Sequence, residues 1–190
     1  MTAFDVHQHL WPQPFVDALE RRSEPPCLRD GELVLEEGRF QRAADADSLD
    51  ARVAGLDRDG IDVAVLSLQP TLGIEALPEP ERDELVDAWV GGVREVLGAA
   101  QGRLLAFAPG CVLDGFAGTS IPAAATRDRD ALAPLLDGLE ERAGVLFVHP
   151  GPVVPPPGAP AWWAWVADYT AQMQAAYLSW LAGGRSRWPS

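Results

Sequence analysis

The chain has 190 residues, 47% of them hydrophobic, which is typical of a globular protein with its own core and excludes a disordered chain. Its formal net charge is −13, and an acidic surface repels phosphate backbones and anionic lipids, so we expect neither nucleic acid nor a membrane surface as a partner. All fifteen basic residues are arginine, and the absence of lysine excludes Schiff-base chemistry and a P-loop lysine.

The N-terminal segment has no basic stretch and no long apolar run. We therefore expect no signal peptide and no transmembrane span, and we expect the protein to be cytoplasmic. Cys27 and Cys111 lie far apart, without the spacing of a disulfide framework or a cysteine zinc site. We expect both to be reduced thiols in the core.

In the first half of the chain, short apolar runs typical of strands alternate with longer helical patterns. Strands are predicted over residues 3–6, 62–68 and 104–108. Between the first two, Ser48 is predicted to cap a helix that runs to Asp59 and is ended by Gly60. Pro78 and Pro80 open a helix predicted to run through Leu97, and residues 23–47 are predicted to be irregular, as a long loop or small insertion.

The same alternation continues in the second half. Residues 117–121 are predicted as a fourth strand and 145–149 as a fifth, with a helix over 129–142 between them. A rigid proline-rich loop over 150–160 then leads to a long, tryptophan-rich helix predicted over 161–182 and ended by Gly183 and Gly184.

Alternating strands and helices predict an α/β fold with about five parallel strands and covering helices, a partial TIM-barrel-like (β/α) fold. A complete eight-fold barrel needs roughly 250 residues. We therefore interpret residues 1–190 as a single domain, the N-terminal part of a (β/α)8 barrel.

The chain contains three histidines, and their placement suggests a metal site. His7 and His9 face the same way on a strand and can converge on one cation, while Asp5 shares that face and is predicted to orient an imidazole. His149 ends the fifth strand, where barrel enzymes place functional residues. Three imidazoles from two strand ends are a plausible catalytic zinc set.

Ordinary roles remain open for these and other residues. A histidine pair near an N-terminus also arises by chance, and a single strand-end histidine is more often simply hydrogen-bonded than a ligand. Gln69 follows the second strand and either lines a pocket or makes a plain turn, and Trp11 is a candidate for an apolar substrate pocket. Asp62 is read as a cap or helix partner, Asp114 is a weak loop candidate, and the tryptophans after residue 160 are read mainly as core or interface residues.

Three segments, DVHQHLWP, GIDVAVLSLQP and VLFVHPGP, resemble the amidohydrolase-related family, in the branch that includes aminocarboxymuconate-semialdehyde decarboxylase. The resemblance spans essentially the whole chain and includes the helix rich in tryptophan. It implies a (β/α)8 barrel with one divalent metal, usually zinc, in which His7 and His9 match the first-strand ligands and His149 the fifth-strand ligand. It further implies hydrolysis, or non-oxidative decarboxylation, of a small organic acid, ester or lactone by a metal-activated water.

The sequence departs from this family in two respects. Members use a histidine of the sixth strand and an aspartate of the eighth, and here the chain ends where a sixth strand is due and has no fourth histidine, so no catalytic residue is assigned. Dinuclear relatives use a carbamylated lysine, which this chain lacks. We expect an enzyme that is incomplete or inactive as this chain alone.

Two alternatives stay open. A truncated barrel can act as a non-catalytic module that assembles through its open sheet edges, as a homo-oligomer or with a complementing chain. A histidine pair after an N-terminal strand also opens the PHP and TatD-type phosphoesterases, although their further acidic and histidine ligands cannot be placed here.

Overall fold

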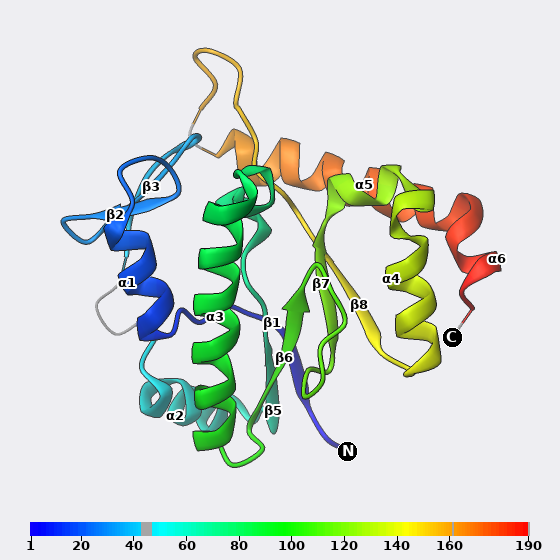
Figure 1. Ribbon diagram of the computed structural model, residues 1–190, viewed down its shortest axis with the longest axis horizontal. Helices are drawn as coiled ribbons and strands as arrows, with labels where there is room; N and C mark the ends of the chain where they lie inside the picture. The colour runs from blue at the N-terminus through cyan, green and yellow to red at the C-terminus, as the bar shows by residue number, and fades with distance from the viewer. Residues whose placement is uncertain (43–46, 161, 190) are drawn as a thin grey trace. The chain divides into compact units, whose positions relative to one another are not determined.

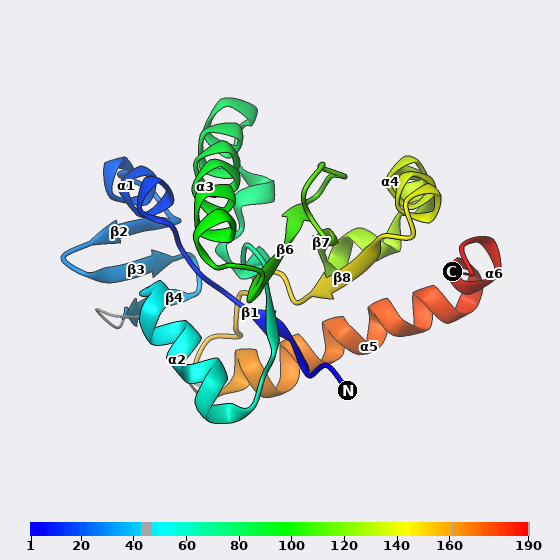
Figure 2. The ribbon, with the colours of Figure 1, turned by 90° about the horizontal axis from the view of Figure 1, so that it is seen from below.

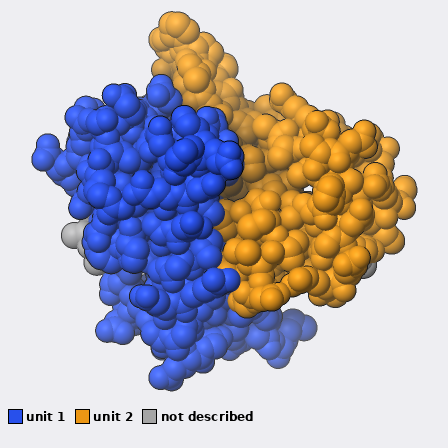
Figure 3. Space-filling model, viewed as in Figure 1, with its two compact units in different colours: residues 1–68, 74–107 blue, residues 69–73, 108–190 orange. Residues whose placement is uncertain are grey.

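The computed structural model describes residues 1–42, 47–160 and 162–189. Within them the chain forms two compact units (Figure 3), one from Met1–Leu68 and Ile74–Phe107, the other from Gln69–Gly73 and Ala108–Ser190. Five parallel strands with helices make the α/β fold, a partial TIM-barrel-like (β/α) architecture, as the alternation in the sequence predicted. That the whole chain is one domain stays a prediction.

The first unit contains the strands β1, β5 and β6, which pair in parallel and in that order (Figure 1). Its parallel strands and longer helices are β1 (Phe4–Gln8), α1 (Gln13–Arg21), α2 (Leu49–Asp59), β5 (Val63–Leu66), α3 (Glu79–Ala99) and β6 (Leu104–Pro109). A short 3-10 turn, η2 (Ile74–Ala76), precedes α3. The predicted strands and the helices α2 and α3 are confirmed within a few residues. Ser48 Oγ accepts the hydrogen bond of Ala51 N, and Gly60 ends α2 with a φ of 69°.

Helix α1 is absent from our predictions. Its buried residues Phe15, Val16, Ala18 and Leu19 follow helical spacing, which is the signal that would have found it. α1 lies against α3 (Figures 1 and 2). The contact is close at Gly92, where a Cβ atom would lie 2.5 Å from Pro12 Cβ.

The region 23–47 was predicted to be irregular, and this is wrong for most of its described residues. It contains a three-stranded antiparallel sheet of β2 (Cys27–Arg29), β3 (Glu32–Leu35) and β4 (Gly38–Gln41). Asp30 and Gly31 connect β2 to β3 with φ values of 52° and 81°. An Asp-Gly pair with two positive φ values suits the tight hairpin turn, and it was the overlooked signal. The part of this prediction on residues 43–46 lies outside the described residues.

The second unit contains β7 (Gly118–Pro122) and β8 (Val145–His149), which pair in parallel from Gly118 with Val145 to Pro122 with His149. Both predicted strands are confirmed. Helix α4 (Arg129–Glu141) connects them, and Asp128 caps it by accepting from Ala131 N. Two 3-10 turns complete this part of the unit: η1 (Pro70–Leu72) and η3 (Ala123–Arg127).

A long helical stretch closes the second unit and is referred to below as the terminal helix. It consists of η4 (Ala164–Asp168), α5 (Tyr169–Ser179), η5 (Trp180–Gly184) and α6 (Arg185–Arg187), where the η segments have π-helical geometry. The predicted end at Gly183 and Gly184 is wrong. Trp188 is buried beyond them and its Nε1 donates to Asp137, which anchors the extra turn. Ala161, the predicted first residue, lies outside the described part.

Each unit has its own apolar core. Trp89 is fully buried in the first unit, and its Nε1 donates to Leu10 O at 3.0 Å. In the second unit Ile121, Leu136, Leu139 and Trp188 are buried. None of the helices formed by the described residues is long and apolar enough to cross a membrane.

Candidate metal centre

The histidine pair lies at the carboxyl end of β1 in the first unit. His7 is the penultimate residue of the strand, and His9 follows directly after its last residue. The two imidazole centroids are 5.1 Å apart and the rings meet edge to face, with an interplanar angle of 85°. The structure therefore brings these two predicted ligands together, His7 exposed and His9 half-buried.

Ser67 holds the ring of His9. His9 Nδ1 lies 2.9 Å from the main-chain oxygen of Ser67 and 3.3 Å from its Oγ. A carbonyl oxygen only accepts, so Nδ1 carries a proton, and in the neutral imidazole the lone pair is then on Nε2. Metal-binding histidines are held in this way by their second nitrogen. Ser67 is fully buried directly after β5, and sequence reasoning missed it.

Arg52, on α2, fixes the main chain around the pair. Its Nη2 donates to His9 O at 2.8 Å, and its Nη1 donates to Gln8 Oε1. Burial lowers the pKa of Arg52, and the nearby carboxylates of Asp47 and Asp5 oppose that shift. Since arginine stays protonated in proteins, Arg52 places a charged donor on the segment that follows β1. It was not identified from the sequence.

Asp5 contacts the main chain of His7 and the side chain of Gln8. Its carboxylate accepts from His7 N at 3.1 Å and from Gln8 Nε2 at 2.7 Å. These bonds shape the strand end from which His7 and His9 project. The expected bond from Asp5 to an imidazole stays a prediction.

The two predicted substrate-binding residues lie in different units. Trp11 is buried in the first unit, packs edge to face on Phe15 at 5.8 Å between centroids, and donates its main-chain N–H to Asp47 at 2.6 Å. These contacts give it a packing role. Gln69, in the second unit, is half-buried and immediately precedes the turn Pro70–Leu72, which agrees with the turn interpretation. A substrate contact of either residue stays a prediction.

His149, in the second unit, is the last residue of β8 and is only 6% exposed. Its Nδ1 lies 2.8 Å from the carbonyl oxygen of Pro150, so this nitrogen also carries the proton and the lone pair is on Nε2. Gln172 holds the loop that follows, because its Oε1 accepts from Gly151 N at 2.7 Å and its Nε2 donates to Gly151 O at 3.3 Å. Gln172 was not identified from the sequence.

The hydrogen bonding of two of the histidines predicted as ligands is compatible with metal binding. His9 and His149 each bond a main-chain carbonyl through Nδ1, which leaves Nε2 as the donor nitrogen. Neutral imidazole suits zinc and related divalent ions. These observations agree with a metal role, and they do not identify the ion.

The weaker candidates have structural roles. Asp62 was read as a cap or helix partner, but its carboxylate instead accepts from Ala3 N at 2.7 Å and holds the start of β1. Asp114 pairs with Arg142 at the surface.

The core position predicted for Cys111 is wrong, because Cys111 is exposed after β6. Partial desolvation raises the pKa of its thiol, which does not favour a reactive thiolate. Cys27 is buried as predicted.

The predicted core or interface role of the aromatic residues holds unevenly. Trp163 and Trp180 are half-buried, whereas Trp165 and Tyr177 are exposed on the terminal helix and Trp162 is exposed just before it.

No model of a known protein family matches the chain, and no curated protein matches it. Solved structures do. IDCase of Metarhizium anisopliae aligns with a TM-score of 0.63 at 19% identity, over 94% of this chain and 61% of that one. The 5-carboxyvanillate decarboxylase of Sphingomonas paucimobilis gives 0.65 at 16%, over 99% and 65%. The 2,6-dihydroxybenzoate decarboxylase of Rhizobium gives 0.62 at 17%, over 100% and 64%.

The chain thus spans less than two thirds of the length of each of these three proteins. At such low identity the likeness concerns the fold. Two of the three are named decarboxylases. The chain has the fold of part of these proteins, which agrees with the partial (β/α) barrel that the alternation of strands and helices predicts.

Proposed function

We propose that His7, His9 and His149 hold one divalent metal, most suitably zinc, in a site of the amidohydrolase type. The observation that carries the proposal is the hydrogen bonding of His9 and His149. Each bonds a main-chain carbonyl oxygen through Nδ1, which is how metal-binding histidines are held when Nε2 is the ligand. Three nitrogen ligands with an open position are the pattern of catalytic zinc.

The fold class supports the choice of these three residues. In (β/α) barrels, functional side chains come from the carboxyl ends of the strands. His9 follows the end of β1 and His149 ends β8. The imidazole of His7 lies edge to face with that of His9, with the centroids 5.1 Å apart, so both rings can reach one ion.

We propose hydrolysis, or non-oxidative decarboxylation, of a small organic acid, ester or lactone as the reaction of the complete site. A divalent metal held there would supply Lewis-acid activation of a substrate or of water. Other residues of the chain position the proposed ligands. Ser67 orients the ring of His9, Arg52 and Asp5 bond the main chain at the end of β1, and Gln172 bonds the loop after His149. The likeness to decarboxylases of 5-carboxyvanillate and 2,6-dihydroxybenzoate favours an aromatic carboxylic acid.

Proton transfer is the part of this reaction for which the chain has no assigned residue. The family resemblance assigns it to a histidine and an aspartate of later strands, and the three histidines here are all assigned as ligands. General acid–base catalysis contributes typically about 10²–10⁴-fold to rate. Metal binding, and not turnover, is therefore the direct test of the proposal on this chain.

The test is elemental analysis of the purified chain after zinc addition and dialysis. We expect one zinc per chain, and His9→Ala and His149→Ala should each weaken zinc binding by at least about tenfold. Cys111→Ser is the matched control, since it removes an exposed thiol that could bind zinc unspecifically. Zinc content unchanged in both histidine variants, or lost in the cysteine variant, would contradict the proposal.

A non-catalytic assembly module remains the second candidate, and one observation favours it. The terminal helix exposes large apolar side chains: Trp165, Val166, Tyr177, Leu178 and Leu181. Contiguous exposed apolar surface marks interaction sites in soluble proteins. This function would not require the metal.

A further inference from the structure

The second unit has a polar pocket of about 270 Å³ where the start of α4 meets the end of the terminal helix. Three arginines line it, Arg127, Arg129 and Arg187, and it is referred to below as the arginine pocket. All of its residues belong to the second unit, and none of them is a proposed ligand of the metal.

The three arginines form no ion pair with any carboxylate of the described residues. The eight ion pairs between described residues all use other arginines. The chain has 28 acidic residues, so carboxylates are abundant and these three guanidiniums are nevertheless left without one. Each guanidinium carries five N–H donors in a planar fork that matches carboxylate and phosphate oxygens. Their donors are therefore available to a ligand.

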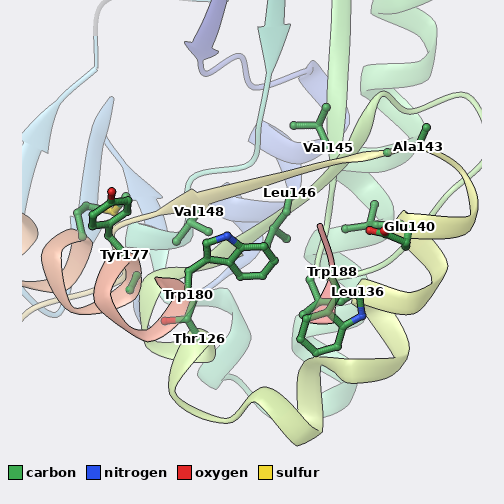
Figure 4. A pocket seen from close by; sticks show the side chains of 14 residues that line it. Thr126, Leu136, Glu140, Ala143, Val145, Leu146, Val148, Tyr177, Trp180 and Trp188 are labelled. Carbon is green, nitrogen blue, oxygen red and sulfur yellow. The ribbon is translucent and has the colours of Figure 1, made fainter. Parts of the chain in front are cut away.

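Trp188 holds the guanidinium of Arg187. The Cζ atom of Arg187 lies 4.4 Å from the centroid of the indole. The indole itself is buried and fixed, because its Nε1 donates to Asp137 at 2.7 Å. Figure 4 shows it beside Leu136, in the wall of an apolar cavity formed by α4, β8 and the terminal helix. Stacking uses the face of a guanidinium and leaves the N–H groups in its plane free to donate.

Gly183 makes room for Arg129. A Cβ atom at Gly183 would lie 1.9 Å from Arg129 Nη1, so only a glycine lets the guanidinium lie directly against the terminal helix. Gly183 was predicted to help end this helix, and the structure instead places it within η5, beside an arginine of α4. Two of the three arginines thus have defined places, Arg187 by stacking and Arg129 by this close approach.

Two carboxylates also line the arginine pocket and restrict which anion it suits. Asp128 caps α4 by accepting from Ala131 N at 3.0 Å, and Asp130 is exposed on the first turn of that helix. Three arginines against two carboxylates leave the pocket positive, in a chain whose net charge is −13. The field of such a chain repels anions at long range, so binding needs strong local contacts. A compact oxyanion with two charges and several acceptor oxygens, as in a phosphoryl group, makes them best.

We propose that the arginine pocket binds a phosphoryl group. Arg129 and Arg187 donate forked hydrogen bonds to its oxygens, and Arg127 adds a third positive charge. The pocket, at about 270 Å³, is smaller than the roughly 300–1,000 Å³ of common ligand pockets, which favours free phosphate or a small phosphate ester. This inference concerns the second unit alone and does not depend on the proposed metal site.

The test is titration calorimetry of the full chain, freed of metal, with inorganic phosphate, phenyl phosphate and acetate at constant ionic strength. At about pH 8 both phosphates are mainly doubly charged. We expect phosphate to bind with a Kd of about 1 mM or lower, at least about tenfold tighter than acetate. Tighter binding of phenyl phosphate than of phosphate would identify an ester as the ligand, and the reverse order free phosphate. Acetate binding as tightly as phosphate, or no phosphate binding up to about 10 mM, would overturn the proposal.

Charge variants locate the binding. Arg129→Gln and Arg187→Gln should each weaken phosphate at least about fivefold, because each removes a forked donor. Arg142→Gln is the matched control: it removes the same charge just after the other end of α4, where Arg142 pairs with Asp114 at the surface. It should change phosphate affinity by less than about twofold. Equal losses in all three variants, or none in the first two, would count against this pocket.

Gly183→Ala tests the geometry at unchanged charge. Its Cβ atom must displace the flexible end of Arg129, so we expect weaker phosphate binding with an unchanged circular dichroism spectrum. Unchanged affinity in the folded variant would contradict the assigned place of Arg129. If Gly183→Ala does not fold, the three arginine variants decide.

Discussion

At the scale of single residues, Ser67 offers His9 two possible acceptors, its main-chain oxygen and its hydroxyl, and a substitution can tell which of them matters. The shorter bond of His9 Nδ1 is to Ser67 O, at 2.9 Å, and the hydroxyl lies further away at 3.3 Å. Ser67→Ala keeps the carbonyl, so we expect zinc affinity to fall by less than about tenfold, well below the effect of His9→Ala. Competition with a zinc-sensitive dye measures this. Ser120→Ala, another buried serine, should have no effect. A loss in Ser67→Ala as large as that in His9→Ala would contradict this assignment.

Arg52 makes a second residue-scale prediction. Replacing it with methionine removes the bonds to His9 O and Gln8 Oε1 and leaves those acceptors without their charged donor. We expect a loss of about 1–3 kcal/mol in the free energy of unfolding, measured by urea denaturation. Arg58→Met on the same helix breaks only an exposed pair with Asp59 and should change it by less than about 1 kcal/mol. Equal losses of stability in the Arg52 and Arg58 variants would show that the bonds of Arg52 to Gln8 and His9 do not stabilise the fold.

At the scale of elements, the contact of α1 with α3 depends on one of two adjacent glycines. A Cβ atom at Gly92 would lie 2.5 Å from Pro12 Cβ, whereas one at Gly91 meets nothing within 4 Å. Helix propensity alone makes alanine better than glycine at both positions, by about 1 kcal/mol. We expect Gly91→Ala to stabilise the chain by up to that amount. Gly92→Ala should destabilise it by about 1–3 kcal/mol, because α1 must move away.

Thermal or urea unfolding followed by circular dichroism measures both glycine variants. The comparison needs no further control, since the two substitutions are chemically identical and adjacent in α3. Similar stabilisation by both would show that α1 does not pack on α3 as described.

At the scale of the whole molecule, the apolar side chains of the terminal helix predict association. Leu178 is 55% exposed, and neighbours such as Tyr177 and Leu181 extend the same apolar surface. We expect the 20.4 kDa chain to elute from sizing chromatography as an oligomer. Leu178→Glu should shift the equilibrium toward the monomer. Gln174→Glu adds the same charge one turn earlier at an exposed polar position and should not. A wild-type monomer at all concentrations tested would contradict the assembly function.

Much of the local structure was predictable because it depends on neighbours in sequence. Apolar periodicity located all five parallel strands and the helices α2, α3 and α4, and Ser48 and Gly60 marked the ends of α2. The failures were also local. The sheet of β2, β3 and β4 was missed because the Asp30-Gly31 turn was overlooked, and α1 was missed because its four buried residues were not read as a helix.

The sequence by itself determined the alternation of strands and helices, the absence of lysine chemistry, and the positions of three histidines at two strand ends. Only the tertiary structure decided which atoms hold them: Ser67 O lies 58 residues from His9, and Arg52 lies 43 residues from it. It also decided that the terminal helix continues past Gly183 and Gly184, and that a cavity lies behind β8. The physical reason is that periodicity records which face of an element is buried, whereas hydrogen-bond partners and cavities depend on how distant elements pack.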